Sequence, residues 1–205
     1  MNPRTGAEIF PGLRPGSENG WAGLAGGPAP FAIAADHFKY VVFKDPNWDF
    51  RTLNFDKDVE LADSLDGGAI TATEPHLQPF FAHGGKLIIY HGWNDQLIAP
   101  TNSVNYYRSV VSAVGGGEKT ANSARLYMVP GMNHCRGGDG PTTFDMVTAL
   151  EQWVERRTAP ERVIAAHVIN GTTDRTRPLC PYPQIAKYKG SGSTDNAASF
   201  SCAAP

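Results

Sequence analysis

Two short apolar runs, separated by an amphipathic segment of helix length, constrain the fold of this chain most. The first run is KLIIY at residues 86–90, and the second is ARLYMV at residues 124–129. The first run is nearly continuous, which is typical of a strand buried on both faces, and the second run is a further strand candidate. Between them, residues 101–114 carry apolar side chains at helical spacing and are followed by the glycines 115–117, a common helix stop. We therefore expect a strand, a helix and a second strand.

Further segments extend this alternation. Helical spacing of apolar residues is found at 31–43, 55–65, 143–156 and in a stretch that ends at the glycines 84–85. Asn54 or Asp56 is expected to cap the second of these helices, and Thr101 the helix between the two strands. Residues 163–169 are expected to add a strand. Alternating helices and strands indicate an α/β sheet whose parallel strands are joined by right-handed crossovers.

Charge and hydropathy exclude two kinds of partner. The formal charge of −2 comes from 18 basic and 20 acidic side chains that form no basic run, so we expect no nucleic acid partner. Apolar runs stay well below the roughly 20 residues that span a bilayer, so no membrane partner is expected either. The opening MNPRTGAEIF has neither the basic start nor the apolar stretch of a signal peptide.

Polar residues follow both expected strands and are candidates for catalysis. The first strand leads into HGWND, which ends at Asp95, and the second leads into PGMNHC, which contains His134. Catalytic groups gather at the carboxyl ends of strands in open α/β sheets, where an acid could orient a base. The residues alone also allow a turn aspartate and a loop histidine, with equal weight. His91 is expected to pack or hydrogen-bond structurally and not to act as a second base.

A serine nucleophile is missing from the expected place. In the α/β-hydrolase order of serine, acid and histidine, the serine must precede Asp95. Only Ser17 and Ser64 do so, and neither stands in a G-x-S-x-G turn. We therefore predict an acid and a base without a nucleophile in this chain.

Two motifs resemble a known family. KLIIYHGWNDQLIAP (residues 86–100) and VPGMNHC (residues 129–135) resemble the acid and histidine motifs of the tannase and feruloyl esterase family. PRTGAEIFPGL and FKYVVFKDPNWD resemble the region that precedes them in that family. The resemblance implies the carboxy-terminal portion of an α/β-hydrolase fold, preceded by the end of a lid. It also implies that Asp95 is the triad acid and His134 the triad base, in an enzyme that cleaves esters of aromatic acids such as gallate or hydroxycinnamates.

The resemblance suggests how the chain is divided. Residues 1–30, rich in proline and glycine, are expected to be a loop without regular helix or strand and resemble the return segment of a lid. Residues 31–170 form the α/β-hydrolase part, and residues 171–205 a disulfide-stapled tail. Trp93, Ile98 and Trp21 are candidates to line the substrate site, although packing is the more common role of such side chains.

The chain has three cysteines, an odd number. Cys180 and Cys202 flank a weakly apolar tail that a disulfide would stabilise, while two reduced surface thiols remain the alternative. Members of the family pair a cysteine after the catalytic histidine with one before the catalytic serine. By this resemblance Cys135 has its partner in an upstream segment, and a single buried cysteine is the alternative.

No metal or cofactor is expected in this segment. Zinc sites use histidines at paired spacing, and four histidines of this chain lack it: His37, His76, His83 and His167. The family's lid carries a calcium loop, but residues 63–67 lack the alternating oxygen ligands that calcium needs. Calcium is therefore expected only elsewhere in a longer protein.

The residues and the resemblance together predict a Ser-His-Asp carboxylic ester hydrolase for small aromatic esters. The longer protein is expected to be secreted or periplasmic, and this chain alone to be inactive. Two alternatives remain: a non-catalytic α/β-hydrolase-like binding module, and a hydrolase of the same family for esters derived from aromatic polyesters. An upstream reading frame with an export signal and a nucleophile turn would favour the esterase.

Overall fold

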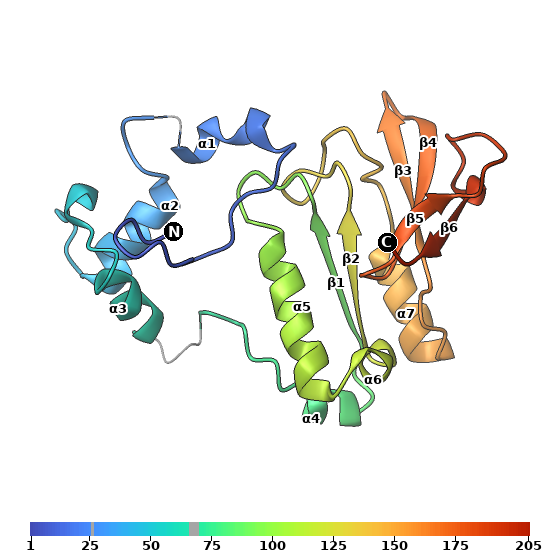
Figure 1. The fold of residues 1–205 in the computed structure, drawn as a ribbon, viewed down its shortest axis with the longest axis horizontal. Coiled ribbons are helices and arrows are strands. Elements are labelled where there is room, and N and C mark those ends of the chain that lie inside the picture. Colours follow the sequence, from blue (N-terminus) through green and yellow to red (C-terminus); the bar gives the residue numbers. More distant parts are fainter. Residues whose placement is uncertain (26, 66–69) are drawn as a thin grey trace.

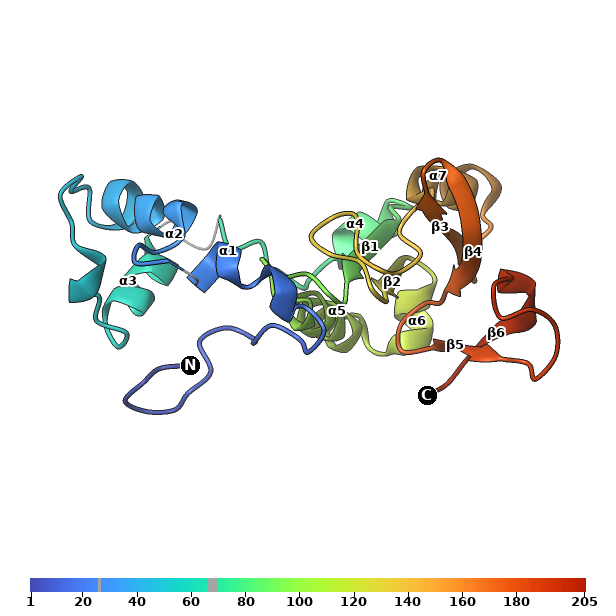
Figure 2. The same cartoon turned by 90° about the horizontal axis from the view of Figure 1, so that it is seen from above.

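The computed structural model describes residues 1–25, 27–65 and 70–205 (Figure 1). A small parallel sheet lies at the centre, with short helices of the first third of the chain on one side and the C-terminal strands on the other. Figure 2 shows the same order from above. Part of the segment 63–67, expected to lack calcium ligands, lies outside the described residues.

Strands β1 (Leu87–Gly92) and β2 (Ala124–Val129) pair in parallel, with Leu87 opposite Ala124 and Gly92 opposite Val129. They confirm the two predicted strands. Helix α5 (Thr101–Val114) connects them, followed by the short helix α6 (Gly117–Ala121). The expected burial on both faces was wrong for β1, which is only partly buried and has Tyr90 46% exposed. Strand β2 is the more deeply buried of the two.

Strand β2 contributes to an apolar core on each of its faces. Leu126 and Met128 pack with Val104 and Tyr107 of α5. On the other face the cluster consists of Tyr127, Val129, Met132, Met146, Val163, Ala165 and Leu179. Because side chains alternate along a strand, Ala124, Leu126 and Met128 belong to one cluster and Tyr127 and Val129 to the other.

The helices that cover the sheet have identifiable ends. Helix α7 (Met146–Arg156) begins after Asp145, whose carboxylate accepts from the N–H of Thr148 at 2.9 Å. Helix α4 (Gln78–Ala82) precedes β1, as predicted. Helix α5 ends at Gly115, whose φ of 93° lies in the left-handed region that favours glycine. The predicted cap of α5 was wrong: Thr101 is its first residue, and no side chain caps it.

The first third of the chain forms short helical elements: η1 (Glu18–Gly20), α1 (Ala22–Ala25), α2 (Ala32–Asp36), η2 (His37–Val42), η3 (Phe50–Thr52) and α3 (Asp58–Ser64). The expectation that residues 1–30 lack regular helix was wrong for the single turn α1. The predicted helix 31–43 is confirmed as α2 continued by η2, which has π-helical hydrogen bonding. Asn54 precedes α3, and its side chain accepts from the N–H groups of Asp56 and Lys57.

Two antiparallel hairpins end the chain. Strand β3 (Val163–Ile169) was predicted and pairs with β4 (Thr172–Leu179). Strand β5 (Ile185–Tyr188) pairs with β6 (Phe200–Ala203), with η4 (Ala197–Ser199) just before β6. A disulfide joins Cys180 to Cys202, as predicted. It connects the last strand to the segment that leaves β4.

Candidate active site

Backbone hydrogen bonds connect the loops that follow β1 and β2. The N–H of Trp93 donates to Val129 at 2.9 Å, and that of Asn94 donates to Met132 at 3.0 Å. Gly92 permits this approach, since a Cβ at this position would lie 2.2 Å from the carbonyl oxygen of Met132. The parallel pairing therefore brings the acid loop and the histidine loop together at the carboxyl edge of the sheet.

Asp95 and His134 form a hydrogen-bonded pair. Oδ2 of Asp95 lies 2.9 Å from Nδ1 of His134. The side chain of Asp95 is 3% exposed, whereas that of His134 is 39% exposed. No described residue hydrogen-bonds Nε2 of His134, which is the atom that would exchange a proton with a reacting group. The arrangement suits a buried acid that orients a solvent-accessible base.

The carboxylate of Asp95 is held on both oxygens. Oδ1 accepts from the N–H groups of Leu97 at 2.8 Å and Ile98 at 2.9 Å. Burial by itself would raise the pKa of Asp95. The hydrogen bonds, led by that from the Ile98 N–H, outweigh burial and hold the pKa of Asp95 below its usual value. Asp95 is therefore ionised at neutral pH and accepts the proton of Nδ1.

His91 is a further member of this network. Its Nε2 lies 3.0 Å from Oδ2 of Asp95, and its Nδ1 lies 2.7 Å from Oγ of Ser103 in α5. His91 hydrogen-bonds, as expected, but neither partner was predicted. The spacing of four residues between His91 and Asp95 was a possible signal. Ser103 offered none, because it is one of several polar residues on the helix.

The N-terminal loop contacts the acid loop. The side-chain amide of Asn94 donates to the carbonyl of Gly16 at 2.9 Å. Gly20 lies so close to Gln96 that a Cβ on Gly20 would be 2.3 Å from Cγ of that side chain. Gln96 in turn accepts from the backbone N–H of His134 at 3.2 Å. Segments far apart in the sequence thus surround the acid and the base.

The three residues expected to line a substrate site differ in their surroundings. Trp93 is half-buried, packs against the cluster that contains Val104, and has the Arg14 guanidinium 5.6 Å from its ring centroid. Ile98 and Trp21 are exposed, and the indole N–H of Trp21 donates to Ser17 at 2.8 Å. Trp93 therefore has a packing role, and substrate contact stays a prediction for all three.

Cys135 directly follows His134. It is a free, exposed thiol whose φ of 60° is in the left-handed region. The alternative of a buried cysteine is therefore wrong. Among the described residues, no cysteine pairs with Cys135, because the other two form their own disulfide. Ser17 is buried and donates to the carbonyl of Arg14 at 2.7 Å. No serine of the described ranges hydrogen-bonds the ring of His134.

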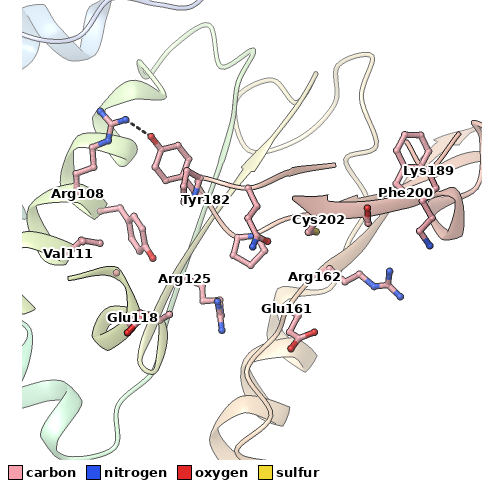
Figure 3. A pocket seen from close by; sticks show the side chains of 17 residues that line it. Arg108, Val111, Glu118, Arg125, Glu161, Arg162, Tyr182, Lys189, Phe200 and Cys202 are labelled. Carbon is pink, nitrogen blue, oxygen red and sulfur yellow. Dashed lines mark hydrogen bonds between the residues drawn. The ribbon is translucent and has the colours of Figure 1, made fainter. Parts of the chain in front are cut away.

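A pocket elsewhere in the molecule is shown in Figure 3. It has a volume of about 930 Å³ and lies between α5, α6 and the β5–β6 hairpin. On one wall, Arg108 donates to the hydroxyl of Tyr182 at 2.5 Å. Neither triad candidate lines this pocket.

Within the described residues, no group of three or more His, Cys, Asp or Glu side chains is arranged to hold a metal ion. No helix in the same ranges has the length and apolarity that a membrane span requires.

Comparison with known proteins adds a family match. The model described as "Tannase and feruloyl esterase" matches residues 21–203. A mono(2-hydroxyethyl) terephthalate hydrolase of Piscinibacter sakaiensis is 47% identical over 145 residues, which cover 69% of this chain and 23% of that protein. A probable feruloyl esterase B-2 of Aspergillus terreus is 34% identical over 215 residues, which cover 96% of this chain and 41% of that protein.

Solved structures give the same result. The crystal structure of feruloyl esterase B from Aspergillus oryzae superposes with a TM-score of 0.90 at 30% identity, over 97% of this chain and 42% of that chain. The tannin acyl hydrolase from Aspergillus niger superposes with a TM-score of 0.70 at 24% identity, which indicates a shared fold. This chain spans less than half the length of each of the relatives described.

Proposed function

Because the chain belongs to the tannase and feruloyl esterase family, we propose that it is the acid- and base-bearing part of a serine hydrolase for aromatic carboxylic esters. The observation that carries the proposal is the hydrogen bond of 2.9 Å between buried Asp95 and solvent-accessible His134. The nucleophile is a serine in the portion of the longer protein that this chain does not include.

The proposed reaction proceeds in two stages. Nε2 of His134 takes the proton of the serine hydroxyl as the oxygen attacks the ester carbonyl, and then gives it to the leaving alcohol. Asp95 keeps the ring oriented and stabilises the imidazolium. Water, activated by the same nitrogen, then attacks the acyl-enzyme and releases the aromatic acid.

The position of Cys135 supports the location of the nucleophile. Its exposed thiol is adjacent to the base, so a disulfide to a cysteine beside the serine would bring the two loops together. The Cys180–Cys202 disulfide fits an oxidising compartment, which supports a secreted or periplasmic location for the longer protein.

The proposed division of the chain follows the same family pattern. Residues 1–30 are the return segment of a lid, residues 31–170 the carboxy-terminal part of an α/β-hydrolase, and residues 171–205 the stapled tail. The contacts of Gly16 and Gly20 with the acid loop support a lid segment near the site. Calcium, if the longer protein holds it, belongs to the rest of the lid.

A second candidate substrate has a specific observation in its favour. The terephthalate monoester hydrolase shares 47% identity with a segment of this chain, against 34% for the feruloyl esterase B-2. Mono(2-hydroxyethyl) terephthalate is therefore an alternative to feruloyl and galloyl esters. Comparing kcat/KM on methyl ferulate, methyl gallate and this monoester separates the candidates.

The test uses the 205-residue chain and an extended protein that includes the upstream segment. We expect hydrolysis only by the extended protein, and His134→Ala to lower its kcat by a factor on the order of 10⁴. His76→Ala is the matched control, because His76 is exposed and pairs with Glu74. Turnover by the short chain that His134→Ala abolishes would contradict the missing serine. An extended protein that binds aromatic esters without cleaving them would favour the binding module.

A further inference from the structure

We propose that His91, which hydrogen-bonds Ser103, is a positioning residue: it holds the carboxylate of Asp95 in the orientation that orients the ring of His134. This inference rests on the proposed function. Oδ2 of Asp95 contacts two ring nitrogens, Nδ1 of His134 at 2.9 Å and Nε2 of His91 at 3.0 Å. The side chain of His91 is 13% exposed, so little water competes for this contact. Four polar side chains thus form a continuous chain from α5 to the base.

The hydrogen-bonding capacity of each group fixes the direction of the chain. An ionised carboxylate only accepts, so Nε2 of His91 carries the proton that Asp95 receives. In a neutral imidazole the other nitrogen then accepts, and the hydroxyl of Ser103 is its donor at 2.7 Å. Asp95 therefore selects the tautomer of His91 that donates to it, and the hydroxyl of Ser103 satisfies the other ring nitrogen.

The contact restricts rotation of the carboxylate. Oδ1 accepts from the N–H groups of Leu97 and Ile98, and His91 donates to Oδ2, the oxygen that also contacts Nδ1 of His134. Loss of His91 would leave one lone pair of a buried oxygen without a donor. The carboxylate would then turn or recruit water, and the ring of His134 would lose its fixed orientation. His91 touches no reacting atom and acts only through Asp95.

The first test reads the orientation of His134 directly in the 205-residue chain. In ¹⁵N-labelled protein, the ring Nδ1–H of His134 should give a downfield proton signal while Asp95 accepts it. We expect His91→Leu and Ser103→Ala to shift this signal upfield or broaden it by exchange. His91→Gln should restore it, because a glutamine amide can donate from about the position of Nε2.

Matched controls separate positioning from general destabilisation. His167→Gln removes another ring–carboxylate contact, 2.6 Å long, between Nδ1 of His167 and Asp174, and should leave the His134 signal unchanged. Ser103→Thr keeps the hydroxyl and should behave like the parent protein. If His91→Leu fails to fold, Ser103→Ala, which removes one oxygen, still decides the question.

The second test uses the extended protein of the hydrolysis assay. We expect His91→Leu and Ser103→Ala to lower kcat about tenfold or more with KM unchanged, and His91→Gln to recover most of the loss. An unchanged His134 signal and unchanged kcat in both variants would overturn the inference. A signal that depends on His91 in a protein without esterase activity would support the positioning role and contradict the proposed function.

Discussion

Asp95 shows how a single buried carboxylate can remain charged. It accepts hydrogen bonds on both oxygens, two of them from backbone N–H groups that the turn after β1 presents. Backbone donors are fixed by the fold and are not lost when a side chain moves. The low pKa of Asp95 therefore belongs to the local turn as much as to the two histidines.

This low pKa predicts a pH dependence of stability. A carboxylate whose pKa is lower in the folded than in the unfolded protein stabilises the fold above its unfolded pKa of about 3.9, and this contribution is lost as the pH falls through the folded value. Asp95→Asn should lower the free energy of unfolding by about 1.5–3 kcal/mol at pH 7. The difference between parent and variant should shrink as the pH falls below 4.

Urea unfolding of both proteins at pH 7, 5, 4 and 3 measures this difference. Other carboxylates with lowered pKa values, such as Asp145, affect parent and variant equally, so the comparison isolates Asp95. A difference that stayed constant down to pH 3 would show that Asp95 does not titrate below its unfolded value.

At the scale of elements, Gly92 determines how closely the two catalytic loops approach. Gly92→Ala would place a methyl group 2.2 Å from the carbonyl oxygen of Met132, so the loops must separate. We expect the downfield His134 signal to be lost and the extended protein to lose at least tenfold in kcat/KM. The melting temperature should also fall.

Gly12→Ala is the control for this substitution, because a Cβ on Gly12 meets no atom within 4 Å. It should leave the His134 signal and the melting temperature as in the parent. If Gly92→Ala retained the signal, a close approach of the loops would not be required for the Asp95–His134 contact.

The elements that were predictable from sequence are those with a strong apolar pattern. β2 and α5 were predicted with their observed bounds, because β2 is a nearly continuous apolar run and α5 carries apolar residues at helical spacing. α6, with the sequence GEKTA, has no such pattern and was missed. The β5–β6 pairing was also missed, because its strands lie in a glycine- and serine-rich tail whose order depends on contacts with the rest of the chain.

The candidate site was predictable to the same extent. Asp95 and His134 follow strands, and parallel pairing places strand ends together, so their proximity followed from topology. The contact of His91 with Ser103 depends on how α5 lies against the end of β1, which no sequence pattern specifies.

At the scale of the whole molecule, β2 contributes side chains to both apolar cores. Leu126 is fully buried on the α5 face, while Tyr127 is fully buried on the opposite face. Leu126→Ala should lower the free energy of unfolding by about 2–5 kcal/mol. Because the cores share a strand, circular dichroism and tryptophan fluorescence should report one transition at the same urea concentration.

Val147→Ala is the matched control, because Val147 lies on the exposed side of α7. Its effect should stay within about 0.5 kcal/mol. Two separate transitions in the Leu126→Ala protein would show that the cores unfold independently.

The hydrogen-bond donors to Asp95 differ in how far they lie from it along the sequence. Except for His134, all of the donors to Asp95 lie between His91 and Ile98, so the carboxylate acquires them as soon as one turn and one strand end have formed. His134 alone arrives across a separation of 39 residues. The acid can thus be assembled early during folding, and completion of the pair waits for the later event of closing a long loop.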